Sequence, residues 1–121
     1  MPSASFTKRI PHGAGELLEM VANVEEYPNF IELISSLRIT KQLSETDFEA
    51  EAVAAYKSIR QNFKSLVHVD REKKVIRVTK AEKGGPVKNL ENRWAFHELS
   101  DGTTLVDFYV DVTLKAFPLN L

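Results

Sequence analysis

The side chains that most often carry chemistry in proteins are few in this sequence. His12, His68 and His97 read as isolated, because no second histidine or carboxylate stands beside them at the spacing of a metal site. The chain has no cysteine, which excludes a thiol nucleophile, a cysteine-bound metal and a disulfide framework. We therefore expect structural or solvent-exposed histidines, and neither a metal site nor a catalytic cofactor.

Paired carboxylates and phosphate loops are the other patterns that could do chemistry. Asp107 and Asp111 lie on one face of a predicted strand, but four residues of strand span about 13 Å. Glycoside chemistry uses carboxylates about 5–9.5 Å apart. The pair Gly84 and Gly85 lacks the following helix and the lysine spacing of a phosphate loop. The sequence thus points away from hydrolytic and nucleotide chemistry, and we expect no enzyme.

Length and composition indicate what kind of domain would hold a functional site. The 121 residues are 43% hydrophobic and 27% charged, which is typical of one globular domain. No apolar run approaches the ~20 residues of a membrane-spanning helix. The N-terminus resembles neither a secretion signal nor a transit peptide. We expect a single domain over residues 1–121, in a bacterial cytoplasm or peripherally at the inner membrane.

Apolar periodicity predicts a β-α-α-β6 order. Alternation of apolar and polar residues indicates strands, whereas apolar residues at helical spacing after Glu16 indicate a helix. A second short helix is predicted from about Pro28, because proline is favoured at the first helical position. The predicted strands cover residues 3–10, 37–43, 48–56, 62–69, 75–81, 87–99 and 104–116.

The register of the last two strands can also be predicted. Trp94 and Phe108 share a face only if the connecting loop has an odd number of residues, most simply 100–102 with its glycine left-handed. Arg93 would then pair with the two aspartates of the last strand on the other face.

The apolar face of the predicted sheet and the distribution of charge along the sequence suggest which kinds of molecule the protein binds. A long curved sheet with an apolar face can enclose a cavity for lipophilic molecules. Residues 54–93 carry eleven basic and four acidic groups, a balance of +7 between acidic flanks. Such a segment can be a surface for anionic lipid or nucleic acid, or simply the solvated face of strands.

Four segments together resemble a known family. They are VEEYPNF (24–30), IRQNFKSLVHVD (59–70), GGPVKNLENRWAF (84–96) and GTTLVDFYVDV (102–112). In this order and spacing they resemble the coenzyme Q-binding protein family of the START-like polyketide cyclase superfamily, which also includes the bacterial ribosome-association toxin. The resemblance spans about residues 4–117.

The resemblance implies an α+β helix-grip (START-like) fold, in which a curved antiparallel sheet wraps around a long C-terminal helix. Two features depart from the family pattern. Val87 stands where the family usually has phenylalanine, which weakens a lid or membrane-dipping role for that loop. The sequence also stops at FPLNL, where relatives continue into the helix. We therefore expect that helix to be missing and the open face to be covered in a homodimer or swapped assembly.

The function that the resemblance implies is the binding and carriage of a lipophilic small molecule, with ubiquinone first, in support of respiratory electron transport. Ubiquinone would be a bound ligand and not a catalytic cofactor. Two alternatives stay open. One is a toxin-like protein that binds the large ribosomal subunit, and the other is a polyketide aromatase/cyclase.

The candidate site residues come from the apolar strand faces and from the family motifs. The candidates for the ligand cavity are Tyr27, Phe30, Tyr56, Phe63, Val67, Leu90, Trp94, Phe96, Phe108 and Val110. The candidates for contact with a head group or a membrane are Lys57, Lys83, Pro86 and Lys88.

Overall fold

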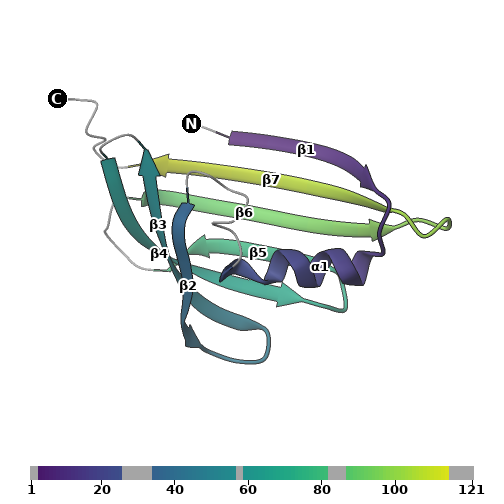
Figure 1. Cartoon of the computed structure of the whole chain (residues 1–121), viewed down its shortest axis with the longest axis horizontal. Helices are drawn as coiled ribbons and strands as arrows, with labels where there is room; N and C mark the ends of the chain where they lie inside the picture. The colour runs from purple at the N-terminus through teal and green to yellow at the C-terminus, as the bar shows by residue number, and fades with distance from the viewer. Residues whose placement is uncertain (1–2, 26–33, 57–58, 82–86, 115–121) are drawn as a thin grey trace.

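A computed structural model describes residues 3–25, 34–56, 59–81 and 87–114. Within these ranges it contains one α-helix and seven strands (Figure 1). Their bounds are β1 Ser3–Ile10, α1 Ala14–Ala22, β2 Ile34–Gln42, β3 Asp47–Tyr56, β4 Ile59–Asp70, β5 Val75–Lys80, β6 Val87–Glu98 and β7 Thr104–Leu114.

The strands form one antiparallel sheet in the order β1-β7-β6-β5-β4-β3-β2. From β2 to β7 each strand pairs with the next one along the chain, which short turns allow in an antiparallel sheet. β1 instead pairs with β7, so the first and last strands lie side by side. The two edges of the sheet are therefore β1 and β2.

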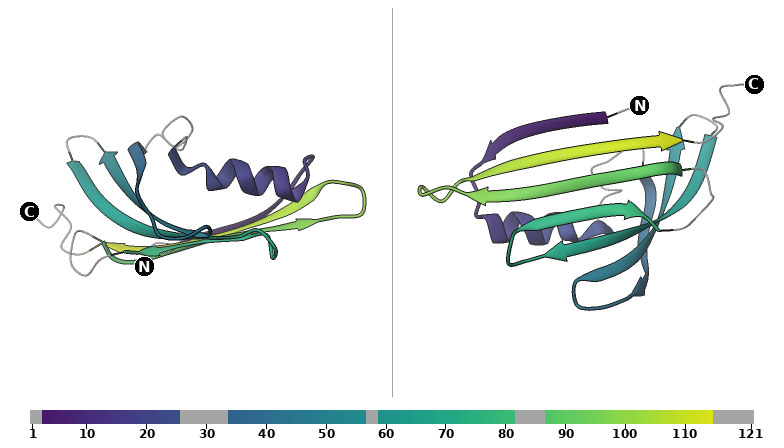
Figure 2. Two further views of the ribbon diagram at one scale, coloured as in Figure 1. Left: turned by 90° about the horizontal axis from the view of Figure 1, so that it is seen from below. Right: turned by 180° about the vertical axis from the view of Figure 1, so that it is seen from behind.

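The sheet is curved, and α1 lies on its concave face (Figure 2). Leu17 and Leu18 of α1 are buried there, as is Ile76 of β5. The buried cluster that joins helix and sheet consists of Ala14, Leu17, Leu18, Val24, Phe48, Ala50, Val67, Val69, Ile76, Phe96 and Val106. The alternating apolar residues of the strands thus supply one side of the core, and the apolar stripe of α1 supplies the other.

The turn between β6 and β7 has the predicted length and register. Trp94 lies opposite Phe108, and the N–H of Leu99 donates to the carbonyl of Thr103 over 2.7 Å. Gly102 has a φ of 84°, the left-handed conformation expected of the last loop residue. The prediction of a three-residue loop is confirmed.

The predicted pairing of Arg93 with Asp107 and Asp111 is confirmed only in part. The charge of Arg93 is one of the causes that lower the pKa of Asp107, although no direct ion pair joins the two side chains among the described contacts. Arg93 lies over the ring of Tyr109, 5.8 Å from its centroid. The carboxylate of Asp107 accepts hydrogen bonds from Thr7 and His97 instead. The sequence pattern missed these partners because Thr7 belongs to β1, which meets β7 only in the folded sheet.

The first helix begins at Ala14, two residues before the predicted Glu16. Its N-cap residue, Gly13, makes no side-chain capping bond. The N–H of Ala14 donates to Oε1 of Glu98 over 2.8 Å, so a residue of β6 takes the place of a local cap. A cap from so distant a residue leaves no local signal in the sequence.

The architecture is the expected helix-grip fold, here a curved antiparallel sheet with the short helix α1 on its concave face. The predicted strand regions all contain strands, with bounds that differ by up to three residues. In the described ranges β7 is the last element, and a long C-terminal helix is absent from them. The second helix predicted from Pro28 lies outside the described residues.

Candidate ligand-binding cavity

An apolar cavity of about 240 Å³ lies on the concave face of the sheet. Its described lining comes from the segment after α1 and from β2, β3, β4, β5, β6 and β7. The lining residues are Val24, Leu37, Ala50, Ala52, Phe63, Ser65, Val67, Val78, Leu90, Asn92, Trp94, Phe108 and Val110. Aliphatic and aromatic side chains dominate this wall, and such a wall favours the burial of an apolar ligand.

Cross-strand register brings this lining together. Residues directly opposite in an antiparallel pair project from the same face of the sheet. Val67 of β4 lies opposite Val78 of β5, which lies opposite Asn92 of β6, which lies opposite Val110 of β7. One row of the floor thus crosses four strands, and a slip of one residue in any pair would turn its lining residues outward.

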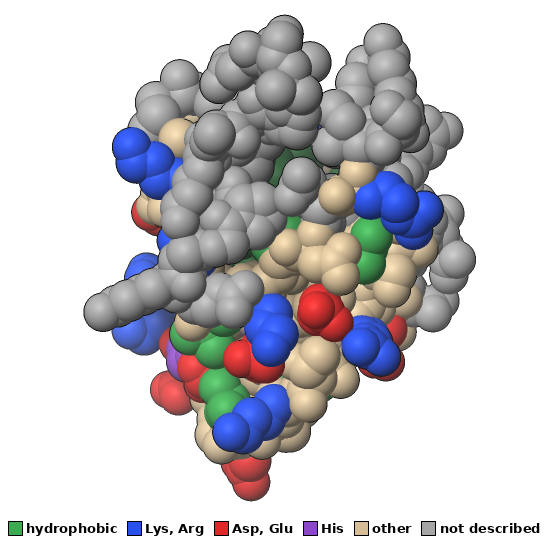
Figure 3. All heavy atoms as spheres, turned by 90° about the vertical axis from the view of Figure 1, so that its left-hand side faces the viewer, with side chains coloured by type: hydrophobic (Ala, Val, Ile, Leu, Met, Phe, Trp, Pro, Cys, Tyr) green, Lys and Arg blue, Asp and Glu red, His purple; other side chains and the backbone are tan. Residues whose placement is uncertain are grey.

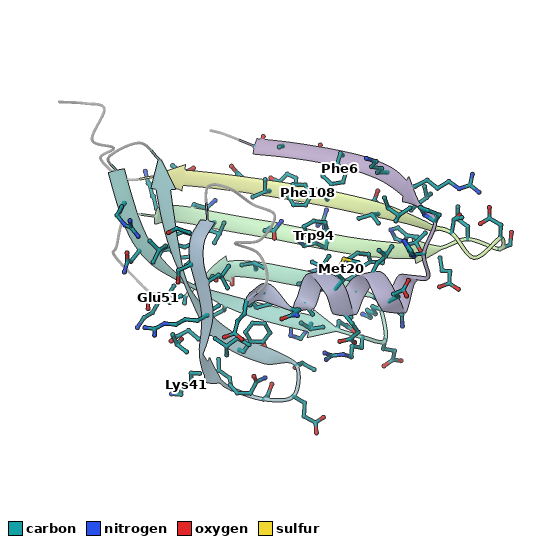
Figure 4. The ribbon with its side chains drawn as sticks, in the orientation of Figure 1. Phe6, Met20, Lys41, Glu51, Trp94 and Phe108 are labelled. Carbon is teal, nitrogen blue, oxygen red and sulfur yellow. The ribbon has the colours of Figure 1, made fainter. Side chains whose placement is uncertain are left out.

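An aromatic cluster continues the floor toward the β1 edge. Figure 4 shows Phe6, Phe108 and Trp94 side by side on β1, β7 and β6, and Met20 on α1. The rings of Phe6 and Phe108 stack with centroids 4.9 Å apart, and the ring of Trp94 meets that of Phe108 edge-on at 4.7 Å. Phe6 and Met20 remain 47% and 56% exposed. The apolar surface of the concave face therefore extends beyond the cavity into solvent.

Six of the predicted cavity residues line this cavity. They are Phe63, Val67, Leu90, Trp94, Phe108 and Val110. Phe96 does not line it, because it is 3% exposed within the core cluster that joins the sheet to α1. Of the predicted contact residues, Lys88 is exposed near the start of β6 and is not part of the lining.

The other predicted site residues cannot be placed. Tyr27, Phe30, Lys57, Lys83 and Pro86 lie outside the described residues, and so does the side chain of Tyr56. Their roles stay predictions.

The small and polar residues of the lining were not among the predicted site residues. Ala50 and Ala52 of β3 are 1% and 3% exposed, and their short side chains leave room above that part of the sheet. The alternation in β3 placed them on the inner face, but nothing in that pattern distinguishes a filled core from a hollow one. Asn92 was not predicted because it is a polar residue within an apolar run. A polar residue at such a position was the feature of the sequence that could have identified it.

The wall also contains a polar donor that lacks a partner. Nε1 of Trp94 is buried and has no acceptor among the described residues. A buried N–H without an acceptor costs about 1–3 kcal/mol. The indole therefore contributes apolar surface to the wall at some cost in stability.

A second hollow, of about 480 Å³, has a more polar lining. It is formed by Ser5, Phe6, Thr7, Arg93, Asp107, Phe108 and Tyr109. An apolar ligand would have to desolvate charged groups there, so the smaller apolar cavity is the better candidate site.

The three histidines lie on the surface, as predicted. His12, His68 and His97 each contact one carboxylate at 2.9–3.0 Å, and their side chains are 46–57% exposed. The prediction that no carboxylate stands beside a histidine at such a spacing is wrong for His12, because its partner Glu16 follows it by four residues. No group of three or more potential metal-binding side chains occurs among the described residues.

Two carboxylates on the convex face of the sheet, Asp107 and Asp47, have lowered pKa values. Hydrogen bonds from Thr7 and His97 lower the pKa of Asp107, with that from Thr7 the larger cause. A hydrogen bond from Thr46 is the main cause that lowers the pKa of Asp47, and His68 adds to it. These groups lie away from the cavity lining, so they bear on stability rather than on the candidate site.

Charges of both signs mix on the end of the molecule seen in Figure 3. Lysine and arginine side chains there lie beside acidic ones. The described residues on this end therefore do not form a face of one charge sign. Elsewhere, Arg38 of β2 pairs with Glu51 of β3 at 3.2 Å. No described helix is long and apolar enough to cross a membrane.

Solved structures share this fold. A protein of Thermus thermophilus matches with a TM-score of 0.82 and 17% identity, over 98% of this chain and 77% of that one. The Zhui aromatase/cyclase of a Streptomyces species matches with a TM-score of 0.80 and 15% identity, over 98% and 72%. An 18 kDa protein of Caulobacter crescentus matches with a TM-score of 0.74 and 28% identity, over 99% and 81%.

The family assignment rests on nearly the whole sequence. No curated protein matches the chain. Residues 10–121 match the family described as polyketide cyclase / dehydrase and lipid transport. That range includes α1 and six of the seven strands, and hence all of the cavity lining. The chain therefore belongs to the polyketide cyclase / dehydrase and lipid transport family.

Proposed function

We propose that this protein binds and carries an apolar small molecule in the concave-face cavity, without acting on it chemically. The observation that carries the proposal is the lining itself. It consists of aliphatic and aromatic side chains, with Ser65 and Asn92 as the polar members among the described residues. Such a wall stabilises a ligand mainly by removing apolar surface from water, at about 25 cal/mol per Å².

Within that class, the proposed cargo is an isoprenoid quinone such as ubiquinone, and the process it serves is respiratory electron transport. The resemblance of residues 24–30, 59–70, 84–96 and 102–112 to coenzyme Q-binding proteins supports this choice. The cavity volume of about 240 Å³ suits a substituted ring with a short part of its tail. The exposed apolar surface of Phe6 and Met20 would then support the remainder of the tail.

The single tryptophan of the chain makes binding measurable. Trp94 is part of the cavity wall, so a bound quinone should quench its fluorescence. We expect saturable quenching of the wild type by a short-tailed quinone. Val110→Phe should weaken it by about tenfold, because the larger side chain fills the cavity.

Tyr109→Phe is the matched control. Tyr109 neighbours Val110 on β7 but lies opposite Arg93, outside the cavity lining, so this variant should bind as the wild type does. Mass spectrometry of organic extracts from the gently purified protein would identify the natural cargo. A folded wild type that takes up neither a quinone nor another apolar ligand would contradict the proposal. Conversion of a bound polyketide chain would favour the cyclase alternative.

A further inference from the structure

Asn92 is a polar residue on the mainly apolar floor of the cavity. Along β6 it stands between the inward-facing Leu90 and Trp94, and across the sheet it lies opposite Val78 and Val110. All four of these neighbours are apolar. Asn92 is partly buried among them, and asparagine is disfavoured in strands, so an apolar side chain would suit packing better.

The orientation of this amide is fixed by the neighbouring strand. Nδ2 of Asn92 donates to the backbone carbonyl of Tyr109 over 2.9 Å. A carbonyl oxygen can only accept, so the NH₂ end of the amide must face β7 and the oxygen must turn away from it. The second N–H and the oxygen Oδ1 are thus what Asn92 can offer to a ligand in the cavity that it lines.

We infer that Asn92 is a specificity-determining residue that selects ligands with a hydroxyl group on an apolar skeleton. This inference rests on the proposed function. A hydroxyl both donates and accepts, so it can bond to Oδ1 as a donor and take the second N–H as an acceptor. A carbonyl or ether oxygen can only accept, and it would leave Oδ1 desolvated without a partner. For the proposed isoprenoid quinone cargo, this means that the site binds the reduced hydroquinone form more tightly than the oxidised quinone form.

Two ligands of nearly equal size test this selection. 4-Pentylphenol and 4-pentyltoluene differ in a hydroxyl and a methyl group, and transfer from water favours the toluene. A preference for the phenol therefore cannot come from hydrophobicity. We expect the wild type to prefer the phenol, and we expect Asn92→Leu to shift the ratio of the two dissociation constants about tenfold toward the toluene. Affinities are read from Trp94 fluorescence or from calorimetry.

Asn89→Leu is the matched control, because Asn89 is an exposed residue of the same strand outside the lining. It should keep the wild-type ratio. An unchanged ratio in Asn92→Leu would overturn the inference, and so would tight binding of 4-pentylanisole, whose ether oxygen only accepts. Both results leave the proposed function intact. If the folded wild type binds none of these ligands and no quinone, the proposed function fails as well.

The test does not depend on one variant. Asn92→Leu removes the bond to the carbonyl of Tyr109 and could fail to fold. In that case the three ligands on the wild type decide between the same outcomes, because preference for the phenol over both the toluene and the anisole needs no variant.

Discussion

At the residue scale, Asp107 ties three strands of the convex face together. Its carboxylate accepts from Thr7 of β1 at 2.6 Å and from His97 of β6 at 3.0 Å. The bond from Thr7 is the largest cause that lowers the pKa of Asp107. Because the folded-state pKa lies below the ordinary Asp value of about 3.9, this stabilisation is present above that value and is lost as the pH falls through the lowered one.

Thr7→Val should raise the pKa of Asp107 toward its ordinary value, since it removes the largest cause of the shift. A carboxyl NMR titration measures this directly. The free energy of unfolding should decrease by about 0.2–1 kcal/mol at neutral pH, because solvent screens so exposed a contact. That loss should shrink at acid pH. An Asp107 pKa that is equal in the wild type and the variant would contradict this account.

At the element scale, two glycines should respond to the same substitution with opposite signs. Gly102 in the β6–β7 turn has a φ of 84°, whereas Gly15 lies within α1. An added Cβ would meet no atom within 4 Å at either position, so backbone conformation decides the outcome. Gly102→Ala should cost about 1–2 kcal/mol of unfolding free energy, and Gly15→Ala should gain about 0.5–1 kcal/mol. Denaturant unfolding of both variants checks the pair, and two changes of the same sign would be inconsistent with it.

At the scale of the whole molecule, the concave face is divided between a packed core and an open cavity. Leu18 of α1 is 1% exposed in the core cluster, whereas Leu90 of β6 is only partly buried and lines the cavity. Leu18→Ala should therefore cost about 2–5 kcal/mol and leave ligand affinity unchanged. Leu90→Ala should cost about 1 kcal/mol and weaken ligand binding. Thermal unfolding and fluorescence titration of the two variants test this division, which the reverse pattern would refute.

The sequence by itself determined the sheet and its faces. Alternation of apolar and polar residues is a local property of a strand, so it predicted the seven strands and the inward position of Phe63, Val67, Trp94 and Phe108. The requirement that Trp94 and Phe108 share a face was enough to predict the turn at 100–102. The helix start was missed, because the acceptor for the N–H of Ala14 is Glu98, 84 residues away.

Only the tertiary structure decided which inward residues are core and which are cavity. Phe96 and Trp94 have the same strand parity, yet Phe96 packs in the core that joins α1 to the sheet while Trp94 lines the cavity. Where the helix lies over the sheet depends on packing between distant elements, and so does the volume left above Ala50 and Ala52. The orientation of the Asn92 amide depends likewise on a carbonyl of the neighbouring strand. Local sequence patterns determine which face of the sheet a side chain occupies. Whether that side chain is packed in the core or lines a cavity depends on the distant elements that lie over the sheet.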